Sequence, residues 1–181
     1  MKTFVALLRG INVGGKNVVR MAELRQTLSE IGLQNVHTHI QSGNIAFQSE
    51  AQVKNELAPA IQAAIEHGYG FRPDVLVLTI EELKAAIARN PFASGADDPK
   101  SIHLYFLTGT PERGALEKAQ SLATESETCQ LVGNVFYLHA PDGIGRSKLA
   151  AGVEKRLGVR ATARNLRSAN KVLELAVTVA A

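Results

Sequence analysis

The chain has 181 residues, of which 45% are hydrophobic and 20% charged, and its formal net charge is +3. This length supports one compact domain or two small ones and excludes a large multidomain enzyme, and the hydrophobic fraction excludes a disordered chain. Because no apolar run reaches the roughly 18 residues that span a bilayer, we expect no transmembrane segment and no membrane partner. The first apolar stretch ends at Arg9 without a small-residue cleavage site, so it predicts a buried strand and not a secretory signal.

The charge is unevenly distributed along the chain. Residues 91–142 contain three basic and seven acidic residues, a formal charge of −4, whereas residues 143–171 contain eight basic residues and one acidic residue, a formal charge of +7. A strongly basic segment attracts anions, so it indicates an anionic ligand or partner. The single cysteine, Cys129, excludes an intramolecular disulfide and a Cys-x-x-Cys motif, which favours a reducing, cytoplasmic setting.

Hydrophobic periodicity in the first half predicts strands and helices in the order strand, helix, strand, strand, helix, strand. We expect a strand over 3–8, a helix from Met21 to a stop at Gly32, and a hairpin of strands over 35–41 and 45–47. A second helix follows, with its apolar face at Val53, Leu57, Ile61 and Ile65, and then a strand over 75–78. This is the order of the ferredoxin-like fold. Ser49 with Gln52, and Thr79 with Glu82, are spaced as capping boxes, and Pro59 indicates a kink or a late start of its helix.

The second half repeats this order in part. A polar connector over 90–99 precedes a predicted strand over 102–107, a helix capped by Thr110 and Pro111, a hairpin over 128–132 and 135–139, a helix ended by Gly158, and a last helix from Leu166. The two hairpin turns are alike, with Gly-Asn at 43–44 and at 133–134. We therefore expect an α+β protein of two subdomains, residues 1–90 and 91–181. The first is ferredoxin-like, and the second is a partial βαββα repeat with a C-terminal helix.

The first polar cluster, Arg9 to Asn17, directly follows the first predicted strand. It contains G-x-x-x-x-G-K-N, which differs from the nucleotide-binding P-loop only at the last position. Backbone amides at the glycines could bind a phosphate, with Arg9 and Lys16 supplying positive charge. The alternative is a connecting loop that needs glycines with positive φ. A helix that begins near Met21, and not at Lys16, argues against a true P-loop.

Two further clusters combine glycine with polar residues. Ser42 and Asn44 either form only a tight turn or present short polar groups at one end of the sheet. In the segment 139–149, a Gly-rich turn leads into a helix, and we place Arg146, Ser147 and Lys148 in the first turn of that helix. Basic residues are disfavoured there by the helix dipole, so a bound anion is one explanation and solvated surface charge is the other.

The remaining polar residues give weaker signals. Arg164, Arg167 and Lys171 are spaced i, i+3 and i+7, which predicts one face of the last helix, either solvated or forming one wall of an anion site. His37 and His39 share one strand face, but no carboxylate or cysteine at ligand spacing accompanies them. We therefore predict neither a metal site nor a cofactor.

Together these clusters resemble the domain of unknown function 1697 family. The matching stretches are residues 7–17 with Met21 and Leu24, 38–44, 90–92, 141–149 and 162–165. In this family an aromatic residue often occupies the positions of His39 and Leu166. The resemblance implies two α+β subdomains, ferredoxin-like in part, and it implies no established reaction.

The leading functional hypothesis is that the chain binds an anionic, phosphorylated ligand, such as a nucleotide or a nucleic-acid backbone. The ligand would lie in a cleft formed by three Gly-rich basic loops. The predicted ligand-binding residues are Arg9, Asn12, Gly14, Gly15, Lys16, Asn17, Ser42, Asn44, Gly143, Gly145, Arg146, Ser147, Lys148, Arg164 and Asn165.

Two alternatives remain open at this point. One is an enzyme, a hydrolase or a transferase acting on a phosphorylated substrate, with Asp142 as the acid inside a polar cluster. The other is an RNA-binding module that stacks bases on a ferredoxin-like sheet through Phe4 and Phe47. Both aromatic residues fit core positions better, because each lies in an apolar strand pattern. The sequence predicts no particular oligomeric state.

Overall fold

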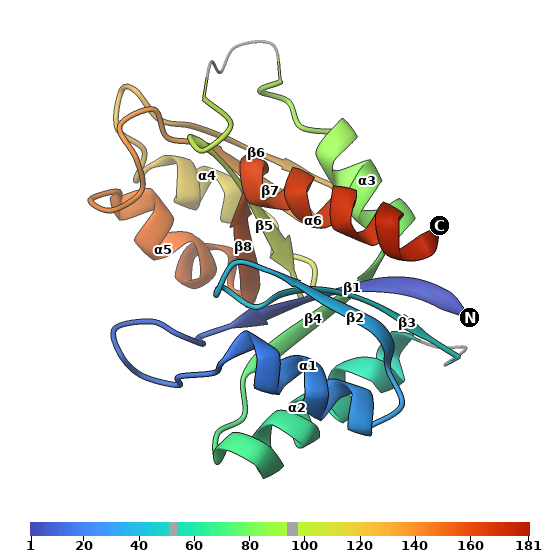
Figure 1. The fold of residues 1–181 in the computed structure, drawn as a ribbon. Coiled ribbons are helices and arrows are strands. Elements are labelled where there is room, and N and C mark those ends of the chain that lie inside the picture. Colours follow the sequence, from blue (N-terminus) through green and yellow to red (C-terminus); the bar gives the residue numbers. More distant parts are fainter. Residues whose placement is uncertain (51–53, 94–97) are drawn as a thin grey trace. The chain divides into compact units, whose positions relative to one another are not determined.

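A computed structural model describes residues 1–50, 54–93 and 98–181 of the chain. These residues form two compact units, Met1–Lys84 with Asn170–Ala181, and Ala85–Ala169. Each unit contains one four-stranded antiparallel sheet together with helices, which agrees with the predicted α+β class (Figure 1). Gln52 of one predicted capping box and residues 94–97 of the connector lie outside the described residues. A domain boundary at residue 90 stays a prediction.

The first unit has the predicted ferredoxin-like order of elements. These are β1 (Lys2–Arg9), α1 (Met21–Glu30), β2 (Gln34–His39), β3 (Asn44–Ser49), α2 (Lys54–Tyr69) and β4 (Asp74–Thr79), and α3 (Ile80–Ala88) follows them. The strand order in the sheet is β2-β3-β1-β4, with every neighbouring pair antiparallel. This is the sheet order of the ferredoxin-like fold, so the interpretation of the first half is confirmed.

One face of this sheet carries the core of the first unit. Strand side chains alternate between faces, and Phe4, Ala6 and Leu8 of β1 pack with Ile45 and Phe47 of β3 in one buried cluster. The apolar faces of α1 and α2 complete the cluster, and both helices lie against this sheet in Figure 1. α2 includes Pro59 in its second turn, where the missing amide removes one intrahelical hydrogen bond.

The opposite face of the same sheet is also apolar, because Val5, Leu7 and Ala46 are fully buried. The last helix, α6 (Leu166–Ala180), belongs to this unit from Asn170 onward. The side chain of Gln48, which alternates with Phe47, donates a hydrogen bond of 2.9 Å to the backbone oxygen of Val179. The C-terminal part of α6 therefore lies on the face of the sheet opposite to α1 and α2.

The second unit is a more complete repeat than the sequence pattern predicts. Its elements are β5 (Ile102–Leu107), α4 (Ala115–Gln120), β6 (Thr128–Val132), β7 (Val135–His139), α5 (Lys148–Leu157) and β8 (Ala161–Asn165). The strand order β6-β7-β5-β8 is equivalent to β2-β3-β1-β4. The predicted βαββα repeat and the C-terminal helix are both present, and β8 supplies the fourth strand.

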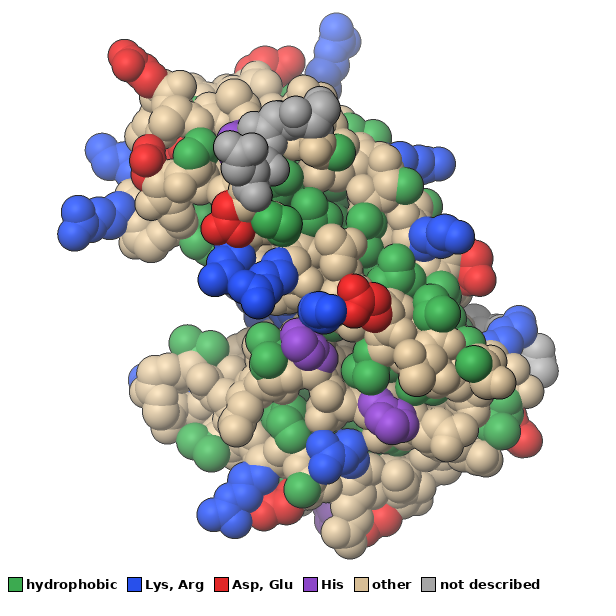
Figure 2. Space-filling model, turned by 45° about the horizontal axis from the view of Figure 1, so that its top comes forward, with side chains coloured by type: hydrophobic (Ala, Val, Ile, Leu, Met, Phe, Trp, Pro, Cys, Tyr) green, Lys and Arg blue, Asp and Glu red, His purple; other side chains and the backbone are tan. Residues whose placement is uncertain are grey.

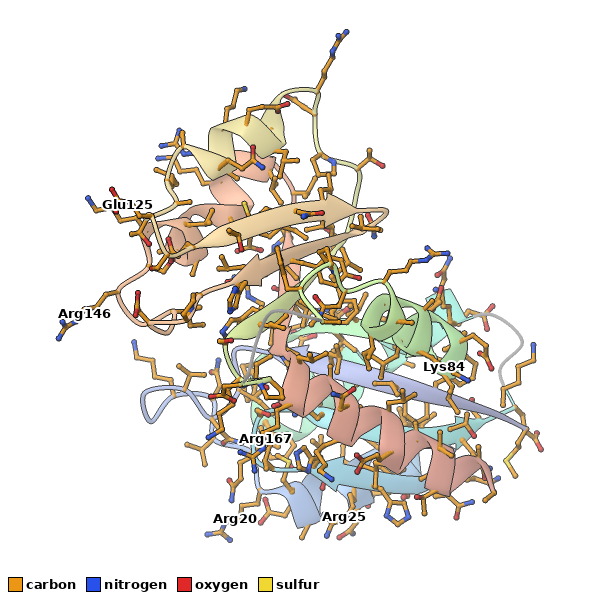
Figure 3. All side chains as sticks on the ribbon, turned by 90° about the horizontal axis from the view of Figure 1, so that it is seen from above. Arg20, Arg25, Lys84, Glu125, Arg146 and Arg167 are labelled. Atoms are coloured by element: carbon orange, nitrogen blue, oxygen red, sulfur yellow. The ribbon has the colours of Figure 1, made fainter. Side chains whose placement is uncertain are left out.

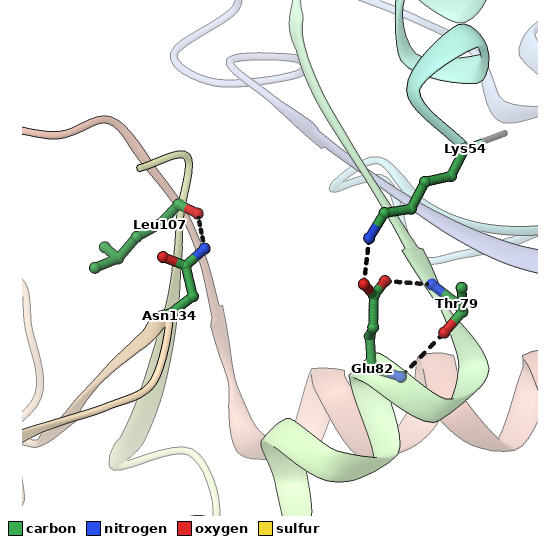
Figure 4. Close-up of polar contacts among 5 residues, drawn as sticks. All are labelled: Lys54, Thr79, Glu82, Leu107 and Asn134. Carbon is green, nitrogen blue, oxygen red and sulfur yellow. Dashed lines mark hydrogen bonds and ion pairs between the residues drawn. The ribbon is translucent and has the colours of Figure 1, made fainter. Parts of the chain in front are cut away.

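The two hairpin turns share a glycine with positive φ but differ in length, because β2 ends at His39 and β3 begins at Asn44, whereas β6 ends at Val132 and β7 begins at Val135. Gly43 and Gly133 both have positive φ, at 73° and 60°. The Leu8 amide donates to the Gly43 oxygen at 2.8 Å, and in the second unit the Leu107 amide donates at 3.0 Å to the oxygen of Asn134, the residue after the glycine. The Asn134 side chain also donates to the Leu107 oxygen (Figure 4). In both units the turn is thus tied to the end of the central strand.

Helix starts agree with the sequence at one place and differ at another. The capping box at α3 is formed, since the Glu82 amide donates to Thr79 Oγ1 at 3.1 Å and the Thr79 amide donates to Glu82 Oε2 at 2.9 Å (Figure 4). The prediction that Thr110 and Pro111 begin a helix is wrong. α4 begins at Ala115, because Gly114 takes a left-handed conformation with φ of 81° immediately before it.

Candidate functional site

The Gly-rich segment between β1 and α1 is a loop whose backbone depends on unusual dihedral angles. Five of its residues have positive φ: Gly10, Asn12, Gly14, Gly15 and Asn17. Glycine and asparagine are the residues that adopt this conformation at least cost. The prediction that this loop needs positive-φ residues is confirmed, and the two asparagines share that role with the glycines.

Two asparagine side chains hold the loop in shape. Asn12 Nδ2 donates to the Val19 oxygen at 3.0 Å and to the Gln41 oxygen at 2.9 Å, while Asn12 Oδ1 accepts from the Val19 amide at 2.8 Å. Asn17 Nδ2 donates to the Gly10 oxygen at 2.8 Å. Both hydrogens of the Asn12 Nδ2 group are thus used inside the protein, and the side chain holds the base of the loop in position. Contact of Asn12 with a ligand stays a prediction.

The tip of the loop, by contrast, is open. Gly14 and Gly15 are exposed, and a Cβ atom added to either would meet nothing within 4 Å. Among the described residues, the backbone hydrogen bonds of the tip run from the Lys16 amide to Val13 and from the Asn12 amide to Asn17, and the glycine amides donate to no backbone acceptor. The loop is therefore fixed at its base, while the two glycines of its tip are exposed.

This geometry is not that of a P-loop. The loop closes on itself through a bridge between Val13 and Lys16, and α1 begins only at Met21. The glycine amides consequently do not continue into the first turn of a helix, which a P-loop requires. The sequence likeness to the P-loop is a coincidence of glycine spacing.

The two basic residues of this loop have different surroundings. Arg9 is the last residue of β1, half-buried, and it lies opposite Asp74 in the register with β4. Asp74 on the adjacent strand therefore carries a charge opposite to that of Arg9. Lys16 is exposed in the loop and has no acidic partner among the described residues.

The turn between β2 and β3 lies next to this loop, because Gln41 accepts the hydrogen bond from Asn12. Gly43 is buried, and a Cβ atom there would lie 2.6 Å from the Leu8 Cβ. Asn44 is also buried, and its Nδ2 donates to Ser42 Oγ at 2.7 Å. We name the segments 9–17 and 41–44 the loop cluster, and both belong to the first unit.

The Gly-rich segment of the second unit leads into α5. Its basic residues do not all lie where the sequence predicts them. Ser147 is the N-cap of α5, and its Oγ accepts from the Ala150 amide at 2.9 Å. Lys148 is the first helical residue, whereas Arg146 precedes the cap and extends into solvent (Figure 3). Placing all three residues in the first helical turn is therefore wrong for Arg146 and Ser147. Gly143, with φ of 82°, and Gly145 lie in the exposed turn before them.

Arg164 and Asn165 belong to β8 and not to the last helix. The prediction of one helical face for Arg164, Arg167 and Lys171 is therefore wrong at Arg164, because the chain stays extended up to Asn165. Asn165 caps α6, since its Oδ1 accepts from the Ser168 amide at 2.8 Å. Burial lowers the pKa of the Arg164 guanidinium to about 10, so the group is still charged at neutral pH.

Strand register shows which predicted residues come together. In the first unit, Leu7 pairs with Asn44, so the loop after β1 and the turn before β3 share one end of the sheet. In the second unit, Ile102 pairs with His139 and His103 pairs with Asn165, so the segment after β7 and the end of β8 share one end of that sheet. Since β5 is equivalent to β1, these are non-equivalent ends of the two repeats. A single cleft containing all three loops joins residues of both units and stays a prediction.

The described residues offer few groups for acid–base chemistry. Asp142 is exposed and its Oδ2 accepts a hydrogen bond of 2.7 Å from Ser126 Oγ, which is the contact expected of a turn residue. Burial, with a smaller contribution from the charge of Glu127, raises the pKa of the Cys129 thiol to about 11, so at neutral pH it is not a thiolate nucleophile. Within the described ranges, no three His, Cys, Asp or Glu side chains are grouped to hold a metal ion.

The aromatic residues considered for base stacking are core residues. Phe4 and Phe47 are 3% and 0% exposed, and their rings stack on each other with centroids 6.0 Å apart. A base could reach them only if the core of the first unit opened.

One polar group that the sequence did not single out is the side chain of Asn90. Its Oδ1 accepts from the Phe92 amide at 3.1 Å, but its buried Nδ2 has no hydrogen-bond partner among the described residues. Phe92 in turn lies against His139 at a ring distance of 5.9 Å. Nothing in the hydrophobic pattern reveals an unsatisfied amide, because its partners are decided by the tertiary structure.

Comparisons with known proteins agree with this architecture. The family model described as "Protein of unknown function (DUF1697)" matches residues 1–137, which is more than half of the chain. The chain belongs to the DUF1697 family. The match includes the loop cluster and residues 90–92, while the Gly-rich segment before α5 and the end of β8 lie beyond it.

A solved structure of this fold is also similar over nearly the whole DUF1697 chain. The conserved bacterial protein SP0830 from Streptococcus pneumoniae has a TM-score of 0.76 and 27% sequence identity, over 96% of this chain and 98% of that one. No curated protein matches the sequence. None of the described helices combines the length and apolar character needed to cross a bilayer.

Proposed function

We propose that this chain binds an anionic, phosphorylated ligand, such as a nucleotide or a nucleic-acid backbone, and that the loop cluster of the first unit makes the principal contact. The observation that supports this most strongly is the contrast within the loop. Asn12 and Asn17 fix its base through side-chain hydrogen bonds, yet its tip packs against nothing. The base of the loop serves the core, because Ile11 and Val19 belong to its buried cluster. The tip adds nothing to that core, and an exposed backbone on a fixed base is suited to contact a ligand.

The groups presented at the tip suit an anion. The amides of Gly14 and Gly15 have no backbone acceptor among the described residues, and Lys16 beside them carries an exposed positive charge. Consecutive amides in a loop of positive-φ residues form a concave donor site for phosphate or carboxylate oxygens. Ser42 and Asn44 contribute by holding the turn that anchors Asn12.

The second unit carries positive charge of its own beside a Gly-rich turn, which fits the same class of ligand. Arg146 and Lys148 flank the N-terminus of α5, where the helix dipole favours a negative charge over their own. Arg164 stays charged at neutral pH and adds to the positive charge of the second unit. Gly143 and Gly145 keep the intervening turn open to a ligand.

The test is a binding measurement with three probes used in turn: inorganic phosphate, ATP and a fluorescently labelled single-stranded oligonucleotide. Lys16→Ala is expected to weaken binding of at least one probe roughly fivefold, because one charge-assisted contact is lost. Lys118→Ala, which removes an exposed positive charge from α4, is the matched control and is expected to change binding little. Affinity is also expected to fall as salt is raised.

The proposal fails if none of the probes binds, if Lys16→Ala and Lys118→Ala weaken binding equally, or if binding does not depend on salt. Equal effects of the two variants would mean that only the net charge of the chain matters. An enzymatic role has no comparable support, because Asp142 is engaged by Ser126 and the Cys129 thiol is protonated at neutral pH.

A further inference from the structure

The first unit also has a small, open groove outside the glycine loop. It has a volume of about 290 Å³ and is lined by Thr38 and His39 of β2 and by four residues of α6: Lys171, Glu174, Leu175 and Thr178. All of these residues belong to the same compact unit. The volume is near the lower limit of ligand pockets, about 300–1,000 Å³, so a ligand that fits must be small.

The helix side of the groove presents groups of both charges. Residues spaced three and four apart lie on one helix face, so Lys171, Glu174 and Thr178 point to the same side of α6. Lys171 Nζ and Glu174 Oε2 form an ion pair of 2.6 Å, and their side chains are 53% and 63% exposed. Thr178 Oγ1 donates to the Glu174 backbone oxygen at 3.0 Å, so its lone pairs are free to accept.

The strand side of the groove is the outer edge of the sheet. β2 is the terminal strand in the order β2-β3-β1-β4, so its outward backbone groups have no partner strand within the described sheet. His39 is half-buried, and its imidazole has no hydrogen-bond partner among the described residues. Thr38 Oγ1 already accepts from Arg25 Nη1 at 2.9 Å, so His39 is the strand residue of the groove whose imidazole is available to a ligand.

The pair of opposite charges decides which ligand fits. A phosphate or a dicarboxylate would meet the Glu174 carboxylate as well as the Lys171 ammonium, so repulsion would offset attraction. A ligand that carries one ammonium and one carboxylate replaces the single internal ion pair by two, one to each residue. The internal pair is exposed and contributes little to stability, so its replacement costs little.

We infer that this groove binds a free α-amino acid, with the ligand carboxylate on Lys171 and the ligand ammonium on Glu174. Leu175 forms the apolar part of the wall beside the ligand side chain. This site differs from the loop cluster in its lining residues and in the charge type of its ligand, although the two are neighbours, since Asn44 Nδ2 donates to the His39 oxygen at 3.4 Å.

The experiment is isothermal titration calorimetry of the full chain with each common amino acid in the millimolar range. Acetate, methylamine and inorganic phosphate serve as probes that carry one kind of charge only. We expect at least one amino acid to bind and none of the three single-charge probes to bind as tightly. Glu174→Gln and Lys171→Gln are each expected to weaken that binding on the order of tenfold, the loss of one charge-assisted contact.

The matched control is Glu23→Gln. Glu23 pairs with Arg20 at the same i, i+3 spacing on the surface of α1, and it does not line the groove. Circular dichroism checks that each variant is folded. The inference is overturned if no amino acid binds, if Glu174→Gln and Lys171→Gln bind as well as Glu23→Gln does, or if acetate or phosphate binds as tightly as any amino acid. Because Lys16 lies outside the groove, Lys16→Ala is expected to leave amino-acid binding unchanged even if phosphate binding is abolished.

Discussion

At the scale of single residues, Gly43 shows how closely the loop cluster is packed at its base. It has φ of 73°, and a Cβ atom there would lie 2.6 Å from the Leu8 Cβ and 3.3 Å from the Leu8 Cα. The Leu8 amide already bonds to the Gly43 oxygen at 2.8 Å, so β1 cannot retreat without breaking that bond. The turn therefore requires glycine for two reasons, its backbone angle and the approach of β1.

This gives a prediction with an internal control. Gly43→Ala is expected to lower the free energy of unfolding by about 2–4 kcal/mol, since strain at positive φ and overpacking add. Gly133 occupies the equivalent turn with φ of 60°, but a Cβ atom there meets nothing within 4 Å. Gly133→Ala is therefore expected to cost only about 1 kcal/mol. Urea denaturation of both variants measures the difference, and equal losses would mean that packing against Leu8 is unimportant.

The asparagines of the loop show what residue-level reasoning could not provide. The sequence predicted positive φ in the segment 9–17, because glycine is abundant there. It did not predict that Asn12 holds the loop in place, because one of its acceptors, the Gln41 oxygen, is 29 positions away along the chain. Contacts between residues so far apart in the sequence depend on the fold, so a local sequence pattern cannot predict them.

At the scale of elements, strands and helices with strong apolar patterns were predicted well, and β8 was missed. Its sequence, Ala-Thr-Ala-Arg-Asn, contains no large apolar residue, and its strand character comes from pairing with β5. The helical spacing of Arg164, Arg167 and Lys171 favoured a helix in its place. Asn165 comes immediately before the apolar helical pattern, and asparagine is a common N-cap residue. This signal excludes Arg164 from the helix.

The capping box of α3 gives a prediction at this scale. Thr79→Ala is expected to lower the free energy of unfolding by about 1 kcal/mol, because the Glu82 amide loses its acceptor. Burial raises the pKa of the Glu82 carboxyl, but the hydrogen bonds from Lys54 and from the Thr79 amide outweigh burial and bring the pKa below its usual value of 4.5 (Figure 4).

A carboxyl with a lowered pKa stabilises the folded state above its unfolded pKa, and this contribution is lost as pH falls through the folded pKa. The stability difference between the wild type and Glu82→Gln is therefore expected to be largest at neutral pH and to vanish in acid below the folded pKa. Urea denaturation across this range measures it. A difference that does not change with pH would show that the charge of Glu82 has no role in the cap.

At the scale of the whole molecule, the two units share one strand order, and their Gly-rich polar segments lie at different ends of the two sheets. The loop cluster occupies the end of β1 in the first unit, whereas the basic segment of the second unit occupies the end of the sheet at which β5 begins. Figure 2 shows Lys and Arg side chains interspersed with Asp and Glu side chains on the face that it draws. The net charge of +3 is thus the sum of local features and not a uniform basic surface.

Membership of the last helix in the first unit leads to a prediction about the whole chain. Ala176 of α6 is fully buried, while its neighbour Val177 is 54% exposed. Ala176→Asp buries an unpaired charge and is expected to speed hydrogen exchange in β1 and β3 more than in β5 and β7. Val177→Asp is the matched control and is expected to change neither. If Ala176→Asp speeds exchange in β5 and β7 as much as in β1 and β3, the assignment of this helix to the first unit is contradicted.

The central claim, that the glycine loop receives a phosphorylated ligand, is tested most directly by nuclear magnetic resonance of the backbone amides. The chain, labelled with nitrogen-15, is titrated with ATP at low and at high salt. We predict saturable shifts of the Gly14, Gly15 and Lys16 amides at low salt, and smaller shifts when salt is raised. The claim is contradicted if these amides do not move while ATP binds elsewhere, or if no amide of the chain moves at all.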